Sequence, residues 1–279
     1  MALLKVSDHR RDFAGMTYVY PVLSRRAGGV SVGINLNPNN ACNWHCVYCQ
    51  VPDLVRGAAP AIDRALLREE LSGFLDALVN GDYMARHVPE GLRTIQDIAF
   101  SGNGEPTSAK AFADIMDDVI SIRDAAGLAH VPVRLITNGS LITRAYVQAG
   151  LKRLALGGGE VWFKVDGGRR EDIARINGVD LDPASVSRAL AVSAALCPTW
   201  VQTCMFAWDG EAPDAAALDA YLACLDAAGV DALRGVLLYG VVRPSMQAEA
   251  PRVAALSEAE LMSIAERIKE KGLTVRVSP

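Results

Sequence analysis

The sequence has 279 residues, 51% hydrophobic and 22% charged, which is enough to bury a large core as one barrel or two small domains. Its formal net charge of −4 gives no field that would hold a polyanion, which argues against a nucleic-acid substrate unless a local basic patch supplies the contacts. The N-terminus has no apolar signal region, and no stretch approaches the ~18 apolar residues of a membrane span. We therefore expect a cytoplasmic protein with no membrane contact.

Short apolar runs alternate along the chain with amphipathic stretches of helical length, an order typical of βα units. The helical stretches have apolar residues three and four positions apart. The expected strands span residues 30–37, 94–101, 131–137, 160–166, 199–206 and 233–241, with a weaker seventh at 273–277. The expected helices span residues 63–79, 110–126, 141–149, 183–196, 212–228 and 257–271.

Several of these helices have residue types at their ends that start or stop a helix. Asp63 precedes an amphipathic run, and Ser257 with Glu260 has the pattern of a capping box. Gly127 and Gly272 stand where a left-handed residue is wanted after the last turn.

Six strand–helix pairs are two short of a closed eightfold barrel. We therefore predict an α/β fold, an open, partial (β/α)6 TIM-type barrel with parallel strands and outer helices. Residues 1–29 would form an N-terminal extension that packs on the barrel, and residues 30–279 would form the core. In such a fold the chemistry belongs at the carboxyl ends of the strands, where nearly every unusual polar or glycine-rich segment of this sequence falls.

The loop after the first expected strand contains Cys42, Cys46 and Cys49, with gaps of three and two residues. Thiolates select zinc or iron–sulfur clusters. A structural zinc site wants four ligands, and His45 is a poor fourth because it adjoins Cys46 and would strain a tetrahedral shell. Three cysteines on a four-iron cluster leave one iron open to a substrate. The spacing therefore favours such a cluster over a zinc site or a redox-inert site.

The motif Cys-x3-Cys-x2-Cys, with Tyr48 just before the last cysteine, resembles that of the radical S-adenosylmethionine (SAM) superfamily, and the likeness extends over most of the chain. The resemblance implies that Cys42, Cys46 and Cys49 hold a [4Fe-4S] cluster whose open iron is chelated by SAM. An electron from the cluster would then cleave SAM to a 5′-deoxyadenosyl radical, which abstracts hydrogen from the substrate. It also implies an electron donor such as flavodoxin or ferredoxin.

A glycine-containing segment after the second expected strand, residues 101–106, is similar to the family's glycine-glycine-glutamate segment, whose backbone meets the SAM ammonium. Glycines suit that role because a side chain would keep the backbone from a close approach. Asn103 replaces one glycine of the commonest form, and an ordinary strand-to-helix turn is the alternative. The cofactor-binding candidates here are Gly102, Asn103, Gly104 and Glu105.

Two polar residues, Lys164 and Asp166, lie on one face of a strand that is otherwise expected to be apolar. Either one of them binds the SAM ribose, as strand-four residues of the family do, or the two form a salt bridge. Tyr48 occupies the position that usually lies against adenine in this family. Looser resemblance adds residues expected to line the SAM carboxylate, ribose or adenine: Thr137, Asn138, Val241 and Arg243.

Residues 18–57 look most like the group that contains the archaeal wyosine synthases, which build a tricyclic base on tRNA. Those enzymes carry additional cysteines ahead of the radical SAM loop, whereas this chain has none before Cys42, which argues against the wyosine reaction. We expect a small-molecule substrate, with a mouth covered by residues 1–29 or by the loop 243–257. A macromolecular substrate, either tRNA or a glycyl-radical enzyme, and a non-catalytic iron–sulfur or zinc protein are the alternatives.

Three arginines, Arg25, Arg26 and Arg56, could meet an anionic substrate, because a guanidinium presents a planar fork of donors. Equally, they could cap carbonyl groups or pair with acidic helices. The remaining cysteines are embedded in apolar sequence and are expected to be buried free thiols, and three histidines are expected to be solvated or capping and receive no role. These residues are Cys197, Cys204, Cys224, His9, His87 and His130.

Overall fold

The computed structural model describes residues 3–4, 15–24 and 28–279, and the statements that follow concern these residues. The chain divides into two compact units. The first comprises the described residues up to 41 together with 58–136 and 144–160, and the second comprises residues 42–57, 137–143 and 161–279.

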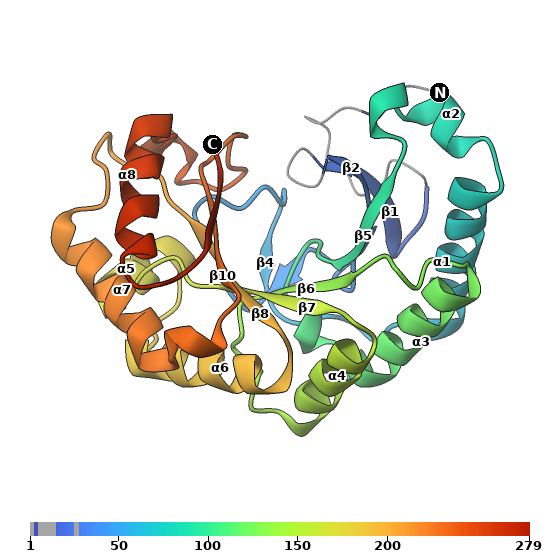
Figure 1. The fold of residues 1–279 in the computed structure, drawn as a ribbon, viewed down its shortest axis with the longest axis horizontal. Coiled ribbons are helices and arrows are strands. Elements are labelled where there is room, and N and C mark those ends of the chain that lie inside the picture. Colours follow the sequence, from blue (N-terminus) through green and yellow to red (C-terminus); the bar gives the residue numbers. More distant parts are fainter. Residues whose placement is uncertain (1–2, 5–14, 25–27) are drawn as a thin grey trace. The chain divides into compact units, whose positions relative to one another are not determined.

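The first unit is built on a sheet in which one antiparallel strand precedes three parallel ones (Figure 1). Three longer helices and one short helix cover it, and α1 contributes the buried residues Leu67, Leu71 and Leu75. In pairing order the strands are β1 (Val19–Ser24), β2 (Gly29–Ile34), β5 (Ile95–Phe100) and β6 (Val133–Thr137). The helices are α1 (Arg64–Val79), α2 (Tyr83–His87), α3 (Phe112–Ala125) and α4 (Ala145–Leu156).

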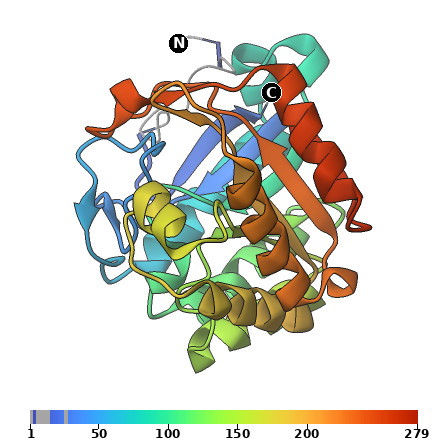
Figure 2. The same cartoon turned by 90° about the vertical axis from the view of Figure 1, so that its left-hand side faces the viewer.

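The second unit contains four parallel strands with α5, α7 and α8 forming an outer layer (Figure 2). Its α6 and α7 are joined by a hydrogen bond of 2.9 Å from Ser187 Oγ to the carbonyl oxygen of Cys224. In pairing order the strands are β7 (Glu160–Lys164), β8 (Thr199–Cys204), β10 (Gly235–Tyr239) and β12 (Val275–Ser278). The helices are α5 (Arg170–Asn177), α6 (Pro183–Leu196), α7 (Ala215–Ala228) and α8 (Glu258–Lys269).

Short elements complete the chain. A two-stranded antiparallel ribbon joins β9 to β11, while β3 contains Cys42 and β4 follows the last of the three cysteines. Single 3₁₀ turns follow several loops. The short strands are β3 (Ala41–Cys42), β4 (Val55–Arg56), β9 (Ala207–Trp208) and β11 (Val253–Ala254), and the turns are Glu90–Leu92, Pro106–Ser108, Val230–Ala232 and Ala250–Arg252.

The predicted α/β partial barrel is confirmed, because each of the six predicted strands is followed by its predicted helix. The predicted helix ends are also present: Asp63 caps α1, and Ser257 with Glu260 forms a capping box on α8. Gly127 and Gly272 have φ angles of 74° and 80°, as the C-terminal signals require. The strand–helix pairs are β2–α1, β5–α3, β6–α4, β7–α6, β8–α7 and β10–α8, and β12 is the weaker seventh strand.

Two elements were not expected from the sequence. Residues 19–24, part of the predicted N-terminal extension, form β1 at the edge of the sheet rather than a segment lying on it. The ring of Tyr20 fills the space over Gly33, where a Cβ would come within 2.2 Å of it. Helix α5 lies in a stretch without a predicted element.

One predicted helix is displaced and one histidine is differently placed. Helix α4 covers residues 145–156 instead of 141–149 and includes Gly150, where a Cβ would lie 2.5 Å from the ring of Phe112. This glycine lets α4 approach α3 closely, although it weakens the helical pattern in the sequence. His87, which was expected to be solvated or capping, is buried in the last turn of α2 with its ring 4.5 Å from that of Tyr83.

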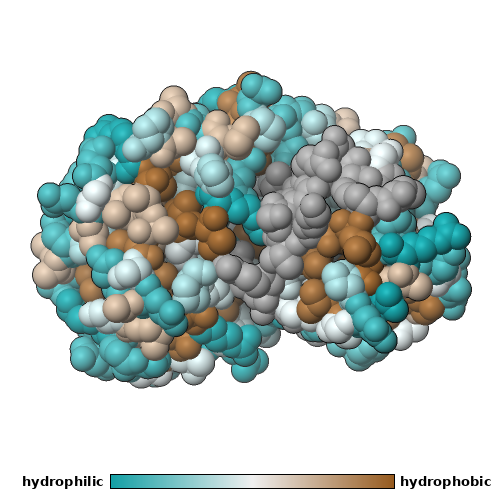
Figure 3. All heavy atoms as spheres, turned by 90° about the horizontal axis from the view of Figure 1, so that it is seen from above, coloured by the Kyte–Doolittle hydropathy of each residue, from teal (hydrophilic) through white to brown (hydrophobic). Residues whose placement is uncertain are grey.

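Hydrophobic side chains lie among hydrophilic ones on the face drawn in Figure 3. In the part of the chain that the structure describes, no helix is both long enough and apolar enough to cross a membrane.

An ion cluster in the first unit leads to a stability prediction. Arg134 bonds Asp97, whose side chain is 4% exposed, and it lies 2.8 Å from Glu160. We expect Arg134→Met to lower the free energy of unfolding by about 3 kcal/mol, because Asp97 would be left charged and buried without its guanidinium partner. Urea denaturation measures this change.

The matched control is Arg153→Met, which removes half-exposed contacts with Asp114 and Asp117 in the same unit. That substitution should change the free energy by no more than about 0.5 kcal/mol. Equal losses of unfolding free energy from the two substitutions would contradict the larger contribution expected of the buried ion cluster around Arg134.

Candidate functional site

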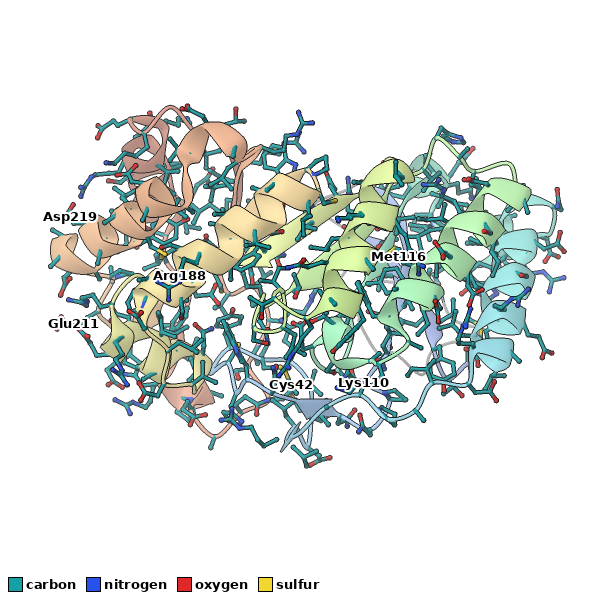
Figure 4. The ribbon with its side chains drawn as sticks, turned by 90° about the horizontal axis from the view of Figure 1, so that it is seen from below. Cys42, Lys110, Met116, Arg188, Glu211 and Asp219 are labelled. Carbon is teal, nitrogen blue, oxygen red and sulfur yellow. The ribbon has the colours of Figure 1, made fainter. Side chains whose placement is uncertain are left out.

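The three cysteines lie on one loop of the second unit as half-buried free thiols. Figure 4 labels Cys42, which stands where the loop begins. The backbone N–H of Cys49 donates to the carbonyl oxygen of Cys46 at 2.9 Å and closes a turn between these two residues. The N–H of Trp44 donates to Cys42 Sγ at 3.5 Å.

Side chains from the segment after β10 fasten this loop. Ser245 Oγ donates to the carbonyl oxygens of Val47 and Cys49, at 2.7 and 3.2 Å. Gln247 Nε2 donates to the carbonyl oxygens of Cys49 and Val51, at 3.2 and 2.8 Å. Both side chains come from buried residues, so the hydrogen bonds fix the loop from its buried side.

The carboxyl end of α5 holds the other half of the loop. The carbonyl oxygens of Ile176 and Asn177 accept the N–H groups of Val47 and His45, each at 2.9 Å. The helix then stops at Gly178, which has a left-handed φ of 65°. A Cβ at this position would lie 2.8 Å from the carbonyl oxygen of His45, so the close approach also requires glycine.

The carboxylate of Asp166 organises the centre of the site. Its Oδ1 accepts the N–H of Cys204 at 2.9 Å, and its Oδ2 accepts Asn177 Nδ2 at 2.9 Å and the hydroxyl of Tyr48. Lys164 Nζ lies 3.6 Å from the same oxygen and donates to the Tyr48 hydroxyl. The salt bridge predicted as one alternative is therefore formed, and 15% of the Lys164 side chain remains exposed.

Burial sets the protonation states around this carboxylate. It raises the pKa of the Cys46 thiol to about 12, an effect that the positive charge of Lys164 partly offsets. Burial and the nearby carboxylate raise the pKa of Tyr48. Burial is the largest single effect on Lys164 and lowers its pKa, but Asp166 and the neighbouring tyrosine and cysteine side chains together outweigh it, so the pKa of the ammonium is well above its ordinary value. At neutral pH the lysine is charged, and the tyrosine and the thiol are protonated.

Among the described residues, no three Cys, His, Asp or Glu side chains converge as ligands of a single metal ion. The donor set fits an iron–sulfur cluster: the three thiols share one loop, and two of them receive hydrogen bonds. Besides the contact at Cys42, Asn177 Nδ2 donates to Cys46 Sγ at 3.4 Å. Hydrogen bonds to sulfur are among the features that set the reduction potential of such clusters. His45 Nε2, the alternative zinc donor, lies 3.8 Å from Glu249 Oε2.

The residues after β6 contact the cysteine loop. Asn138 Nδ2 donates to Asn43 Oδ1 at 2.9 Å, and Asn43 Nδ2 donates to Ser140 Oγ at 2.7 Å. Thr137 is buried, and its Oγ1 accepts the N–H of Gly139 at 3.0 Å. Of these two predicted cofactor residues, Asn138 therefore contacts the cysteine loop, and Thr137 stabilises the turn that follows β6.

Candidates at the end of β10 also come close to the loop. Arg243 donates to Gln50 Oε1 at 3.3 Å, and Val241 packs against the apolar cluster of Val47, Cys204 and Phe206. The guanidinium of the substrate candidate Arg56 donates to two carbonyl oxygens at 2.7 and 2.8 Å, which favours the capping alternative. The other two substrate candidates, Arg25 and Arg26, lie outside the described residues.

The glycines of the segment after β5 lie in the first unit and allow close backbone contacts there. Gly102 has a φ of 144°, and a Cβ on it would come within 2.4 Å of Asn35 Oδ1. A Cβ on Gly104 would come within 2.1 Å of the carbonyl oxygen of Ala41. Any larger residue at either position would displace these neighbours.

Asn103 has an acceptor without a partner. Its Nδ2 donates to Asn40 Oδ1 at 2.6 Å, but its Oδ1 is buried and has no hydrogen-bond partner among the described residues. A buried carbonyl without a donor is costly, so a ligand donor would stabilise it. The carboxylate of Glu105 instead accepts the N–H of Thr107 at 3.0 Å.

A cavity of about 410 Å³ adjoins the Asp166 carboxylate in the second unit. This volume lies within the range of small-molecule sites. The cavity is lined by Asp166, Cys204 and Phe206, and also by Arg169, Arg175 and Trp208. Cys204, like Cys197 and Cys224, is a buried free thiol, as predicted.

Sequence reasoning missed the residues that hold the loop: Asn177, Ser245 and Gln247. Asn177 and Gly178 end an amphipathic stretch with a helix C-terminal signal, which would have revealed α5. Ser245 and Gln247 lie in an irregular segment, where no periodicity marks a buried side chain.

The chain matches no protein-family profile. Over 146 residues, 52% of the chain, it is 32% identical to UPF0026 protein MJ1312 of Methanocaldococcus jannaschii and covers 39% of that protein. Over 131 residues, 47% of the chain, it is 29% identical to GTPase Obg of Brachyspira hyodysenteriae and covers 17% of that protein. The chain thus spans less than half the length of these two curated relatives.

Solved structures resemble nearly the whole chain. A radical SAM methyltransferase from Sphaerobacter thermophilus aligns with a TM-score of 0.64 at 12% identity, over 93% of this chain and 68% of that one. Streptococcus suis SuiB bound to SAM aligns with a TM-score of 0.56 at 11% identity, over 88% of this chain and 49% of that one. The chain shares the fold of these two proteins. At these identities the likeness concerns the fold alone.

The contact between α5 and the cysteine loop is testable at Gly178. We expect Gly178→Ala to lower the iron retained after anaerobic reconstitution, because its Cβ would push the His45 carbonyl and shift Cys46. Gly210→Ala is the matched control, since that glycine also has a left-handed φ, of 85°, but faces open space. Equal iron content in the two variants would contradict the expectation that the end of α5 holds the cysteine loop in the conformation that binds iron.

Proposed function

We propose that the chain is a radical SAM enzyme whose Cys42, Cys46 and Cys49 hold a [4Fe-4S] cluster. The observation that carries the proposal is the three-cysteine loop, held from its buried side by hydrogen bonds within the second unit of a radical SAM fold. When bound, the cluster and SAM supply the reductive cleavage that yields a 5′-deoxyadenosyl radical.

The protein's own contribution is to position and shield this chemistry. Hydrogen bonds from the Trp44 N–H and the Asn177 amide favour thiolate at the sulfurs that they contact. The apolar cluster of Val47, Cys204 and Phe206 excludes water from the buried side of the loop. The loop carbonyls are already bonded to Ser245 and Gln247, so the loop geometry is set before the cluster binds.

For SAM, the first unit offers Gly102, Asn103, Gly104 and Glu105. We assign the SAM ammonium to Asn103 Oδ1 and to the backbone of this segment, because the amide oxygen is a buried acceptor that lacks a donor among the residues the structure describes. In the second unit Lys164 suits a hydroxyl of the ribose better than Asp166, whose carboxylate is already bonded to protein donors. The remaining proposed contacts are Tyr48, Thr137, Asn138, Asp166, Val241 and Arg243.

A small molecule is the substrate class that we propose. Support comes from the cavity beside Asp166 and from the segment after β10, which is anchored on the cysteine loop through Ser245 and Gln247. An anionic group on the substrate, met by Arg25 and Arg26, and an electron donor such as flavodoxin or ferredoxin belong to the same proposal. We place the chain near the wyosine-synthase group in sequence without assigning it a tRNA substrate.

SAM cleavage gives the direct test. Reconstituted protein incubated anaerobically with SAM and dithionite should release 5′-deoxyadenosine, measured by chromatography. Cys46→Ala should abolish this release, whereas Cys224→Ala, which removes a buried thiol between α6 and α7, should retain it. Release from Cys46→Ala at the wild-type rate would refute the assignment of the cluster ligands.

The role of Asn103 predicts a change in SAM affinity. We expect Asn103→Leu to weaken SAM binding by about tenfold, the worth of one hydrogen bond to a charged group. Equilibrium dialysis on the reconstituted protein measures the dissociation constant. Asn80→Leu, which removes an amide that donates to Asp76 at the end of α1, is the control. If Asn103→Leu binds SAM with the wild-type affinity, Asn103 Oδ1 is not part of the SAM site.

A further inference from the structure

The side-chain amide of Asn177 lies between a thiol and a carboxylate. It is 1% exposed, and its Nδ2 lies 3.4 Å from Cys46 Sγ and 2.9 Å from Asp166 Oδ2. A primary amide carries two N–H donors on this nitrogen, so both are used, one on each neighbour. The Asp166 contact therefore fixes the orientation in which the second N–H meets sulfur.

The backbone of Asn177 is fixed as well. The residue ends α5, and its carbonyl oxygen accepts the N–H of His45, next to the cysteine. Asp166 is held in turn by the N–H of Cys204 through its other oxygen. The amide thus has little freedom, because its main chain and its carboxylate partner are both tied to buried structure.

We propose that Asn177 is a positioning residue that raises the reduction potential of the cluster by directing one of its N–H groups at the sulfur of Cys46. The proposal rests on the proposed function, since it requires Cys46 to be a cluster ligand. A hydrogen bond to a ligating sulfur stabilises the extra negative charge of the reduced cluster and so raises its reduction potential. Asn177 touches neither SAM nor the reacting atoms in this assignment.

Two substitutions separate this role from simple packing. Asn177→Asp keeps the size of the side chain but cannot donate when ionised, and Asn177→Leu removes both donors at similar volume. We expect the ratio of reduced to oxidised cluster at a fixed solution potential to fall about tenfold in each variant. Redox titration followed by electron paramagnetic resonance measures this ratio and the signal shape, and iron content is measured in the same samples.

Ser187→Ala is the control, because it removes a buried hydrogen bond of the second unit, to the carbonyl oxygen of Cys224, without touching the cysteine loop. Its ratio of reduced to oxidised cluster should equal that of the wild type. The proposal is overturned if an Asn177 variant with full iron content keeps the wild-type ratio, or if Ser187→Ala shifts the ratio as far. It is also overturned if neither Asn177 variant retains iron, since the contact would then serve assembly. Failure of the wild type to assemble any cluster would instead refute the proposed function.

Discussion

The buried carboxylate of Asp166 is the constraint on which the site depends. Its side chain has no exposed surface, and a buried carboxylate is tolerated only when charged or hydrogen-bonding partners surround it. The partners come from three different elements: Tyr48 from the cysteine loop, Asn177 from the end of α5 and Cys204 from the end of β8. Satisfying one charge thus brings together the parts that hold the thiols.

Burial around the cysteine loop would also make metal binding there depend on pH. Burial raises the pKa of Cys46, so the thiol is protonated in the metal-free protein at neutral pH. In the proposed function iron would bind the thiolate, so loading would release a proton and become more favourable as pH rises toward that pKa. The Asn177 amide and the Lys164 charge reduce this cost because both favour the thiolate.

Much of the fold follows from the sequence because its signals are local. Apolar runs gave the parallel strands, and the capping residues Asp63 and Ser257 gave two helix starts. The missed elements depend on contacts between distant residues: β1 pairs with β2, where Tyr20 covers Gly33, and α4 contains Gly150 because Phe112 needs the space. Local propensity carries little information about such long-range requirements.

At the functional site, too, local signals in the sequence were informative and long-range contacts were not predicted. The cysteine spacing identified the cluster candidates, because three thiolates within eight residues are unusual and chemically specific. It gave no indication of Asn177, which lies more than a hundred residues away in sequence and reaches Cys46 only after α5 has folded. The salt bridge of Lys164 and Asp166 was foreseen as an alternative, but period-two alternation could not show that Asp166 is bonded on both oxygens.

The central claim is that three cysteines hold a cluster with one iron left for SAM. The most direct measurement is electron–nuclear double resonance on the reduced cluster, with SAM carrying a magnetic isotope of nitrogen in its amine. The account predicts a hyperfine coupling from that nitrogen, which appears on adding labelled SAM and is absent with unlabelled SAM. A well-assembled cluster whose spectrum shows no coupling and does not change on adding SAM would contradict it.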